Sequence, residues 1–135
     1  MKKNIIDKYR KKTVQQLVKL ATVHFNKFIR LRDQNKPCIS CGKFTTLQAG
    51  HFYSGGHHSG LKFHETNVHG QCLRCNMYLS GNLNEYRINL IKRIGLAEVE
   101  MLDMRAKMYN QIGYKWDKIT LIDIIETYKL KCKEL

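Results

Sequence analysis

The chain has 135 residues, of which 43% are hydrophobic, and its 24 lysines and arginines outnumber its 11 aspartates and glutamates. This length fits one domain, and this hydrophobic content argues against wholesale disorder. The formal net charge of +13 favours a polyanionic partner, most often nucleic acid, with an anionic membrane surface as the main competitor. No apolar run approaches the roughly 18 residues of a spanning helix, and no signal peptide is visible. We therefore expect a soluble, cytoplasmic protein with no membrane partner.

Apolar residues recur at helical spacing between Val14 and Phe28, which predicts a helix over about residues 13–32. Basic side chains lie largely off this apolar stripe. The helix is expected to stop before Pro37, because proline disfavours helical geometry in the residue before it. Residues 1–36 are therefore predicted to form a basic N-terminal helical segment.

The middle of the chain is rich in glycine, histidine and cysteine. Short β-prone runs at 44–47, 51–53 and 61–63 flank the Gly/Ser/His loop 54–60, which indicates a hairpin with a long connection. A short helix is predicted over 73–79. The pattern indicates a small strand-containing unit framed by helices.

The C-terminal part is predicted to be helical again. Gly81 caps the preceding short helix, and the spacing of Asn82 and Glu85 indicates a capping box that opens the next one. Further helices are predicted over about 97–111 and from Thr120 onward. We expect one compact α+β domain made of three parts: residues 1–36, 37–81 and 82–135.

Four of the five cysteines form two C-x-x-C pairs, Cys38/Cys41 and Cys72/Cys75, with 30 residues between the pairs. In a reducing compartment such pairs are more often metal ligands than disulfides. Two residues of turn bring both thiolates of a pair to one tetrahedral zinc ion. We therefore predict a structural zinc site; a redox pair or reduced core cysteines are the alternative. Cys132 is interpreted as a plain thiol.

Five histidines fall within nineteen residues, between the two cysteine pairs: His51, His57, His58, His64 and His69. Imidazole titrates near neutrality and takes a proton from water, which hydrolysis of a phosphodiester requires together with a divalent cation. His57 and His58 lie in the Gly/Ser loop, where exposure or DNA contact is expected rather than catalysis.

The order of these residues resembles the HNH, or His-Me finger, nuclease motif. The resemblance implies a zinc-stapled ββα core in which His51 is the general base and Asn67 orients that base or its loop. Asn76, directly after Cys75, would bind Mg²⁺. Purely structural roles remain the alternative for all three: His51, Asn67 and Asn76.

One position departs from the HNH pattern. Many members carry an acidic second metal ligand just before the base, and here that position is Gly50. The second magnesium ligand therefore stays open among His69, His64, Glu65 and oxygens of the scissile phosphate.

A closer resemblance spans about residues 26–95, roughly half of the chain. It is to the phage NinG (Rap) family of recombination endonucleases, and these segments carry it: 26–33, 37–42, 49–54, 67–72, 75–76, 79–83 and 85–87. The resemblance implies an endonuclease of branched intermediates such as Holliday junctions and D-loops, located in the cytoplasm of a bacterial host. It further implies structural Zn²⁺ and catalytic Mg²⁺, with Mn²⁺ as a substitute for Mg²⁺, and phage recombination proteins as candidate partners.

Symmetric junction cleavage would suit a homodimer. Six basic residues are candidate DNA contacts, each with a solvated surface charge as its alternative: Arg30, Arg32, Lys43, Lys62, Arg74 and Arg87. Two rival functions share most of these features. A non-catalytic zinc-ribbon DNA-binding protein explains the charge and the cysteines but not His51 and Asn76, and a nonspecific HNH nuclease keeps the chemistry without the branched substrate.

Overall fold

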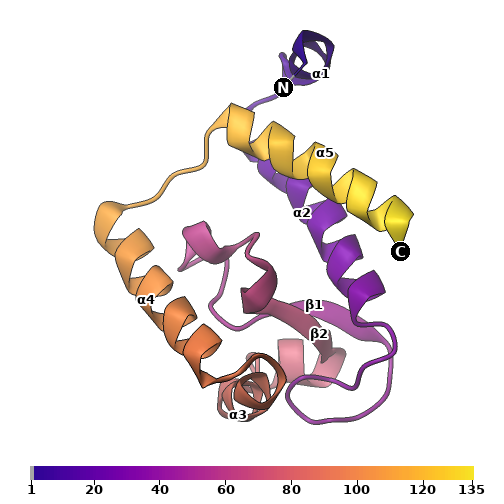
Figure 1. Cartoon of the computed structure of the whole chain (residues 1–135), viewed down its shortest axis with the longest axis vertical. Coiled ribbons are helices and arrows are strands. Elements are labelled where there is room, and N and C mark those ends of the chain that lie inside the picture. The colour runs from indigo at the N-terminus through magenta and orange to yellow at the C-terminus, as the bar shows by residue number, and fades with distance from the viewer. Residues whose placement is uncertain (1) are drawn as a thin grey trace.

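A computed structural model describes residues 2–135 and shows a mixed α+β protein that is mostly helical, with one two-stranded antiparallel sheet (Figure 1). The regular elements are α1 (Lys3–Tyr9), α2 (Val14–Arg32), β1 (Leu47–His51), β2 (Val68–Cys72), α3 (Leu83–Ile94), α4 (Leu96–Ile112) and α5 (Lys118–Glu134). Three short helical turns complete the chain: η1 (Ser59–Leu61), η2 (Glu65–Asn67) and η3 (Arg74–Tyr78). None of the helices formed by residues 2–135 has the length and apolar character needed to cross a lipid bilayer.

The predicted N-terminal helix is confirmed as α2. Thr13 and Gln16 form a reciprocal capping box at its start, which satisfies two backbone donors that the first helical turn leaves free. The helix lies along α5 (Figure 1), and the Phe25 and Tyr128 rings meet edge to face with centroids 4.8 Å apart. Burial of aromatic and aliphatic side chains between these helices builds the largest hydrophobic core.

The two strands pair with Leu47 opposite Cys72 and His51 opposite Val68. The expected hairpin with a long connection is confirmed, but its strands differ from all three predicted runs: β1 meets the runs 44–47 and 51–53 only at Leu47 and His51, and β2 was not predicted. Residues 61–63 form no strand, because Leu61 ends a 3₁₀ turn and Phe63 packs on Phe25 and Trp116 in the largest core. Their apolar character therefore reflects burial and not strand periodicity.

Helices α3 and α4 build a second core with the loops of the middle region. The expected capping box at Asn82 is wrong: Asn82 has a left-handed backbone (φ 42°), and its amide donates to Cys75 Sγ at 3.6 Å. The last helix begins earlier than predicted, because Asp117 accepts from the Thr120 backbone N–H and caps it. The sheet thus lies between two helical pairs, α2 with α5 and α3 with α4 (Figure 1).

Candidate functional site

The four cysteines of the two C-x-x-C pairs converge in space. The sulfur atoms of Cys38, Cys41, Cys72 and Cys75 all lie within 4.8 Å of one another, and Cys41 Sγ is 3.8 Å from Cys72 Sγ. A tetrahedron with zinc–sulfur bonds of about 2.3 Å has edges of about 3.8 Å, so the spacing matches the geometry of bound zinc. The cysteines form no disulfide, and this cluster could hold a zinc ion.

Backbone N–H groups donate to two of these sulfurs. Cys38 Sγ accepts from the backbone N–H groups of Cys41 and Cys72 at 3.5 and 3.3 Å, and Cys72 Sγ accepts from Cys75 N–H at 3.4 Å. Burial by itself raises the pKa of Cys38, but these amide bonds outweigh it and lower the pKa to about 7. The Cys38 thiolate is therefore stabilised before any ion arrives, whereas burial raises the pKa of Cys41 and of Cys75.

His51 lies at the end of β1, half-buried at the mouth of a cleft. Its Nε2 lies 2.9 Å from the Lys62 carbonyl oxygen, which only accepts hydrogen bonds, so Nε2 carries the proton. Its Nδ1 has no hydrogen-bond partner among residues 2–135 and remains a free acceptor. Burial lowers the pKa of His51 below its usual value, which keeps the ring neutral at physiological pH.

Asn67 is fully buried and ties down the loop that follows His51. Its Oδ1 accepts from Tyr53 N–H at 2.8 Å, and its Nδ2 donates to the carbonyls of Tyr53 and Leu61 at 2.9 and 3.1 Å. These bonds hold the two ends of the connection together, near the carbonyl that orients His51. Asn67 is therefore positioned to fix the loop and does not line the cleft.

Asn76 faces the same cleft from η3, a turn closed by an i→i+5 bond from Leu79 N–H to the Arg74 carbonyl at 2.8 Å. Its Nδ2 donates to Gln48 Oε1 at 2.8 Å, so its Oδ1 is left as an acceptor. The cleft has a volume of about 620 Å³, and His57 and His58 of the loop also line it. No aspartate or glutamate of the described part of the chain does so.

The three side chains considered for the second magnesium position lie elsewhere. His69 is buried on the opposite face of the sheet from His51, beside Tyr86 OH at 3.4 Å. Glu65 accepts from Tyr128 OH and Lys131 Nζ at 2.7 and 2.8 Å, and His64 bonds Thr66. The structure therefore does not bring His69, His64 or Glu65 to Asn76.

The missing acidic residue before His51 has a steric explanation. A Cβ atom at Gly50 would lie 2.1 Å from Gln71 Oε1 and 2.7 Å from Gln71 Cβ. Gln71 is fully buried and donates to Ser40 Oγ and to the Gly81 carbonyl. Gln71 thus fills the space that a side chain at position 50 would need.

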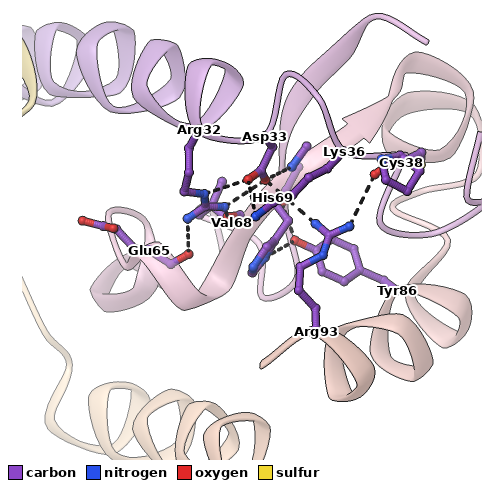
Figure 2. Close-up of polar contacts among 12 residues, drawn as sticks. Arg32, Asp33, Lys36, Cys38, Glu65, Val68, His69, Tyr86 and Arg93 are labelled. Carbon is purple, nitrogen blue, oxygen red and sulfur yellow. Dashed lines mark hydrogen bonds and ion pairs between the residues drawn. The ribbon is translucent and has the colours of Figure 1, made fainter. Parts of the chain in front are cut away.

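An ionic cluster supports this sheet from the end of α2 (Figure 2). The buried Asp33 carboxylate accepts from Arg32 Nε and Nη2 at 2.8 and 2.9 Å and from Gly70 N–H at 2.8 Å. Arg93 of α3 also points toward Asp33, with its Nη1 4.0 Å away (Figure 2). Burial, together with the nearby Arg32 charge, lowers the pKa of His69, which lies in this cluster, to about 3, so the ring is neutral.

Two of the six candidate DNA contacts are held by internal partners. Arg32 bonds Asp33 and the carbonyls of Glu65 and Val68, and Arg87 forms a two-point pair with Asp103 at 3.1 and 2.8 Å. The side chains of the other four have no ion pair among residues 2–135; they are Arg30, Lys43, Lys62 and Arg74. These four keep their charges available to a polyanion.

Sequence reasoning missed one polar residue of the cleft. Asn26 of α2 lines it, and its buried Oδ1 has no hydrogen-bond partner within the described residues. Buried acceptors without partners are uncommon, and a water or an ion commonly satisfies them. In the sequence, Asn26 sits within an amphipathic helix, where an asparagine carries no recognisable pattern.

The family model described as Bacteriophage Lambda NinG protein matches residues 2–135. The chain is 40% identical over 120 residues to Protein ninG of Salmonella phage P22, covering 87% of this chain and 57% of that protein. It is 39% identical to Protein ninG of Escherichia phage lambda over 120 residues, covering 87% and 56%. It is also 44% identical to Protein ninG of Enterobacteria phage H19B over 88 residues, covering 64% and 44%.

The search of solved structures found no significant match. The chain spans little more than half the length of the first two relatives. The family model nevertheless covers nearly the whole chain, and the matched region includes both cysteine pairs, His51 and Asn76. The chain therefore belongs to the NinG family of bacteriophage proteins.

Proposed function

We propose that this chain is a magnesium-dependent endonuclease of the HNH type that cleaves branched DNA recombination intermediates. The observation that carries the proposal is the state of His51. Its Nε2 proton is directed to the Lys62 carbonyl, and its Nδ1 lone pair is left for a water molecule in the cleft. A neutral imidazole fixed in one tautomer by a backbone carbonyl is the arrangement that a general base needs.

The chemistry follows from that base. His51 Nδ1 takes a proton from a water molecule, whose oxygen attacks the scissile phosphorus. The bond from phosphorus to the 3′ oxygen breaks, and that oxygen leaves and takes a proton from solvent. The products carry a 5′ phosphate and a 3′ hydroxyl. The bonds from Asn67 to Tyr53 and Leu61 hold the loop so that His51 keeps this orientation.

The donor set of the cleft fits Mg²⁺ only as a site that the DNA completes. Asn76 Oδ1 is an available amide oxygen, and Asn26 Oδ1 is an acceptor without a partner. Neither residue carries a charge, and Mg²⁺ commonly joins a few protein oxygens to substrate phosphates and waters. When bound, Mg²⁺ would neutralise charge that develops on the scissile phosphate and the leaving oxygen.

Charge supports DNA as the substrate. The formal net charge is +13, and Arg30, Lys43 and Arg74 are exposed. Such cations bind phosphates and release counterions, which makes binding fall steeply as salt rises. The NinG relatives belong to bacteriophages, and the branched substrate is proposed from the resemblance of these motifs to recombination endonucleases.

A DNA-binding protein without catalysis is the second candidate. One observation favours it: no carboxylate of the described residues lines the cleft, so the protein alone offers Mg²⁺ a weak set of ligands. The zinc cluster and the basic charge would serve this function equally well.

Cleavage of a four-way junction, tested against its linear duplex arm, separates these candidates. With Mg²⁺ present, we expect the zinc-loaded chain to cut the junction, and His51→Ala to lower the rate by about 10²- to 10⁴-fold. The matched control is His64→Ala, which removes a half-buried histidine outside the cleft and should keep near-normal activity. If the chain cleaves no DNA, the nuclease proposal is wrong and DNA binding without catalysis is favoured. If it cleaves the junction and the duplex arm equally, the proposed preference for branched DNA is wrong.

A further inference from the structure

The two most exposed aromatic rings of this protein lie together. The chain has seven tyrosines, five phenylalanines and one tryptophan. Among the aromatic side chains of residues 2–135, only Phe44 and Tyr78 are exposed, at 76% and 77%. Every other aromatic ring is buried or half-buried. An exposed aromatic ring forfeits the burial that stabilises such side chains. Two such rings on one surface therefore point to a ligand.

Both rings line one groove beside the zinc cluster. The groove also contains Lys43 and Arg74, each close in sequence to one of the two rings, and the hydroxyls of Thr45 and Thr46. No aspartate or glutamate of the described residues lines it. Aromatic faces, cations and hydroxyls without carboxylates are the chemistry that receives nucleobases and their phosphates.

The charges along the groove determine where the bases and the phosphates of a nucleic acid would lie. Three of the four clustered cysteines line the groove: Cys41, Cys72 and Cys75. Four thiolates around one Zn²⁺ leave excess negative charge, which repels phosphate. Uncharged bases are therefore favoured beside these cysteines and the two rings, and phosphates are favoured at Lys43 and Arg74.

This groove adjoins the cleft that contains His51. The segment from η3 to the start of α3 separates them: Cys75, Tyr78 and Asn82 line the groove, whereas Asn76 and Ser80 line the cleft. Residues that alternate along one short segment thus face the two sites. Bases held in the groove would lie close to a phosphate held in the cleft.

We infer that Phe44 and Tyr78 form a stacking platform for unpaired or unstacked DNA bases, which places a branch point beside the cleft. Paired bases in linear duplex are stacked on their neighbours and offer no free face to such a platform. Bases in single strands and at branch points do offer one. The inference rests on the DNA-binding part of the proposed function, and it supplies a physical basis for preference for branched substrates.

Binding measured without cleavage tests the platform. The zinc-loaded full chain is titrated, without Mg²⁺, into dye-labelled oligothymidylate, a four-way junction and one blunt duplex arm, and fluorescence anisotropy is followed. Phe44→Ala and Tyr78→Ala should each weaken binding of the first two by about fivefold or more and leave duplex binding nearly unchanged. Tyr78→Phe keeps the ring and should bind like the parent chain.

Met104→Ala is the matched control, because Met104 is 65% exposed on α4 and lies outside the groove. Zinc content measured for each variant checks that the cysteine cluster is intact. Unchanged affinity in both alanine variants, or an equal loss on duplex, would overturn the inference. The inference would also be overturned if the parent chain is a dimer and the alanine variants are monomers with the same DNA affinity per subunit, because the rings would then contact a second copy of the chain.

The nuclease proposal is judged separately, by cleavage in the parent chain and in His51→Ala. A chain that cuts no DNA but loses single-strand binding in Phe44→Ala and Tyr78→Ala supports the platform and refutes the nuclease. A chain that cuts junctions while both alanine variants bind and cut like the parent refutes the platform alone.

Discussion

Replacement of Asp33 by asparagine tests the ionic cluster that joins α2 to the sheet. The change keeps the shape of the side chain and removes its charge. Arg32 and Arg93 then lose their counter-ion, and the amide group brings a donor to a place where only acceptors are needed (Figure 2). Gly70 of β2 loses a charged acceptor as well. We therefore expect Asp33→Asn to loosen the sheet that carries His51.

Two estimates of the cost agree. Breaking a buried ion pair costs about 3–5 kcal/mol, and the Arg32 and Arg93 side chains are 22% and 21% exposed, which moves the expected loss to about 2–4 kcal/mol. Burial by itself raises the pKa of Asp33, but bonds from Arg32 and Gly70 outweigh it and lower the pKa from 3.8 to about 2. That shift corresponds to about 2–3 kcal/mol.

The pH dependence has a definite sign. Because the folded-state pKa is lowered, the Asp33 contribution is fully present above 3.8 and is lost as the pH falls toward about 2. Urea unfolding of parent and Asp33→Asn at neutral pH, with zinc saturating, measures the loss directly. Asp103→Asn is the control, because its ion pair with Arg87 is 33% and 39% exposed and should contribute about 1 kcal/mol or less. Equal losses in the two variants would refute the reasoning.

Three further predictions follow from the cleft and the cysteine cluster. Elemental analysis should find one zinc per chain, and chelation of that zinc should lower the free energy of unfolding by an amount on the order of 10 kcal/mol, with loss of secondary structure. An unchanged urea midpoint after chelation would contradict this. Gly50→Ala should lower the free energy of unfolding by about 1–3 kcal/mol, and by less in a Gln71→Ala background, where the added methyl group has room. Equal losses in the two backgrounds would show that the methyl group does not clash with Gln71. The acid limb of the kcat/KM profile should have its midpoint below 6.5, because burial lowers the pKa of His51; a midpoint above 6.5 would argue against this base.

Helices and metal ligands were predictable because their signals are local. The apolar stripe and the Thr13 start of α2 lie within adjacent turns, and a C-x-x-C pair brings its two thiolates together by itself. Residues 61–63 were misjudged because a short apolar run looks alike whether it pairs in a sheet or fills a core. Asn82 was misjudged because its side chain donates to Cys75 Sγ, seven residues earlier, and does not cap the helix, which the spacing of Asn82 and Glu85 could not indicate.

The cleft was predictable only where a motif marked it. His51 and Asn76 were named from the resemblance to the HNH motif, and both line one cleft in the structure. Asp33 and Asn26 were not recognised, because their surroundings come from other elements: Asp33 bonds Gly70, 37 residues away, and Asn26 of α2 lines a cleft whose other lining residues lie between positions 49 and 83. Long-range polar contacts of this kind leave no periodic trace in a sequence.

The cysteine cluster and the cleft are physically coupled. His51 ends β1, whereas Asn76 directly follows Cys75, and the hydrogen bond from Asn76 to Gln48 links the two segments. A two-stranded sheet is marginally stable alone. An ion bound by all four cysteines would link β2 and η3 to the Cys38/Cys41 pair and would thereby fix Asn76 relative to His51. Loss of zinc should therefore abolish function at the cleft even though no cysteine lines it. The metal that is easiest to recognise in the sequence would then act by holding the site at which the proposed magnesium chemistry takes place.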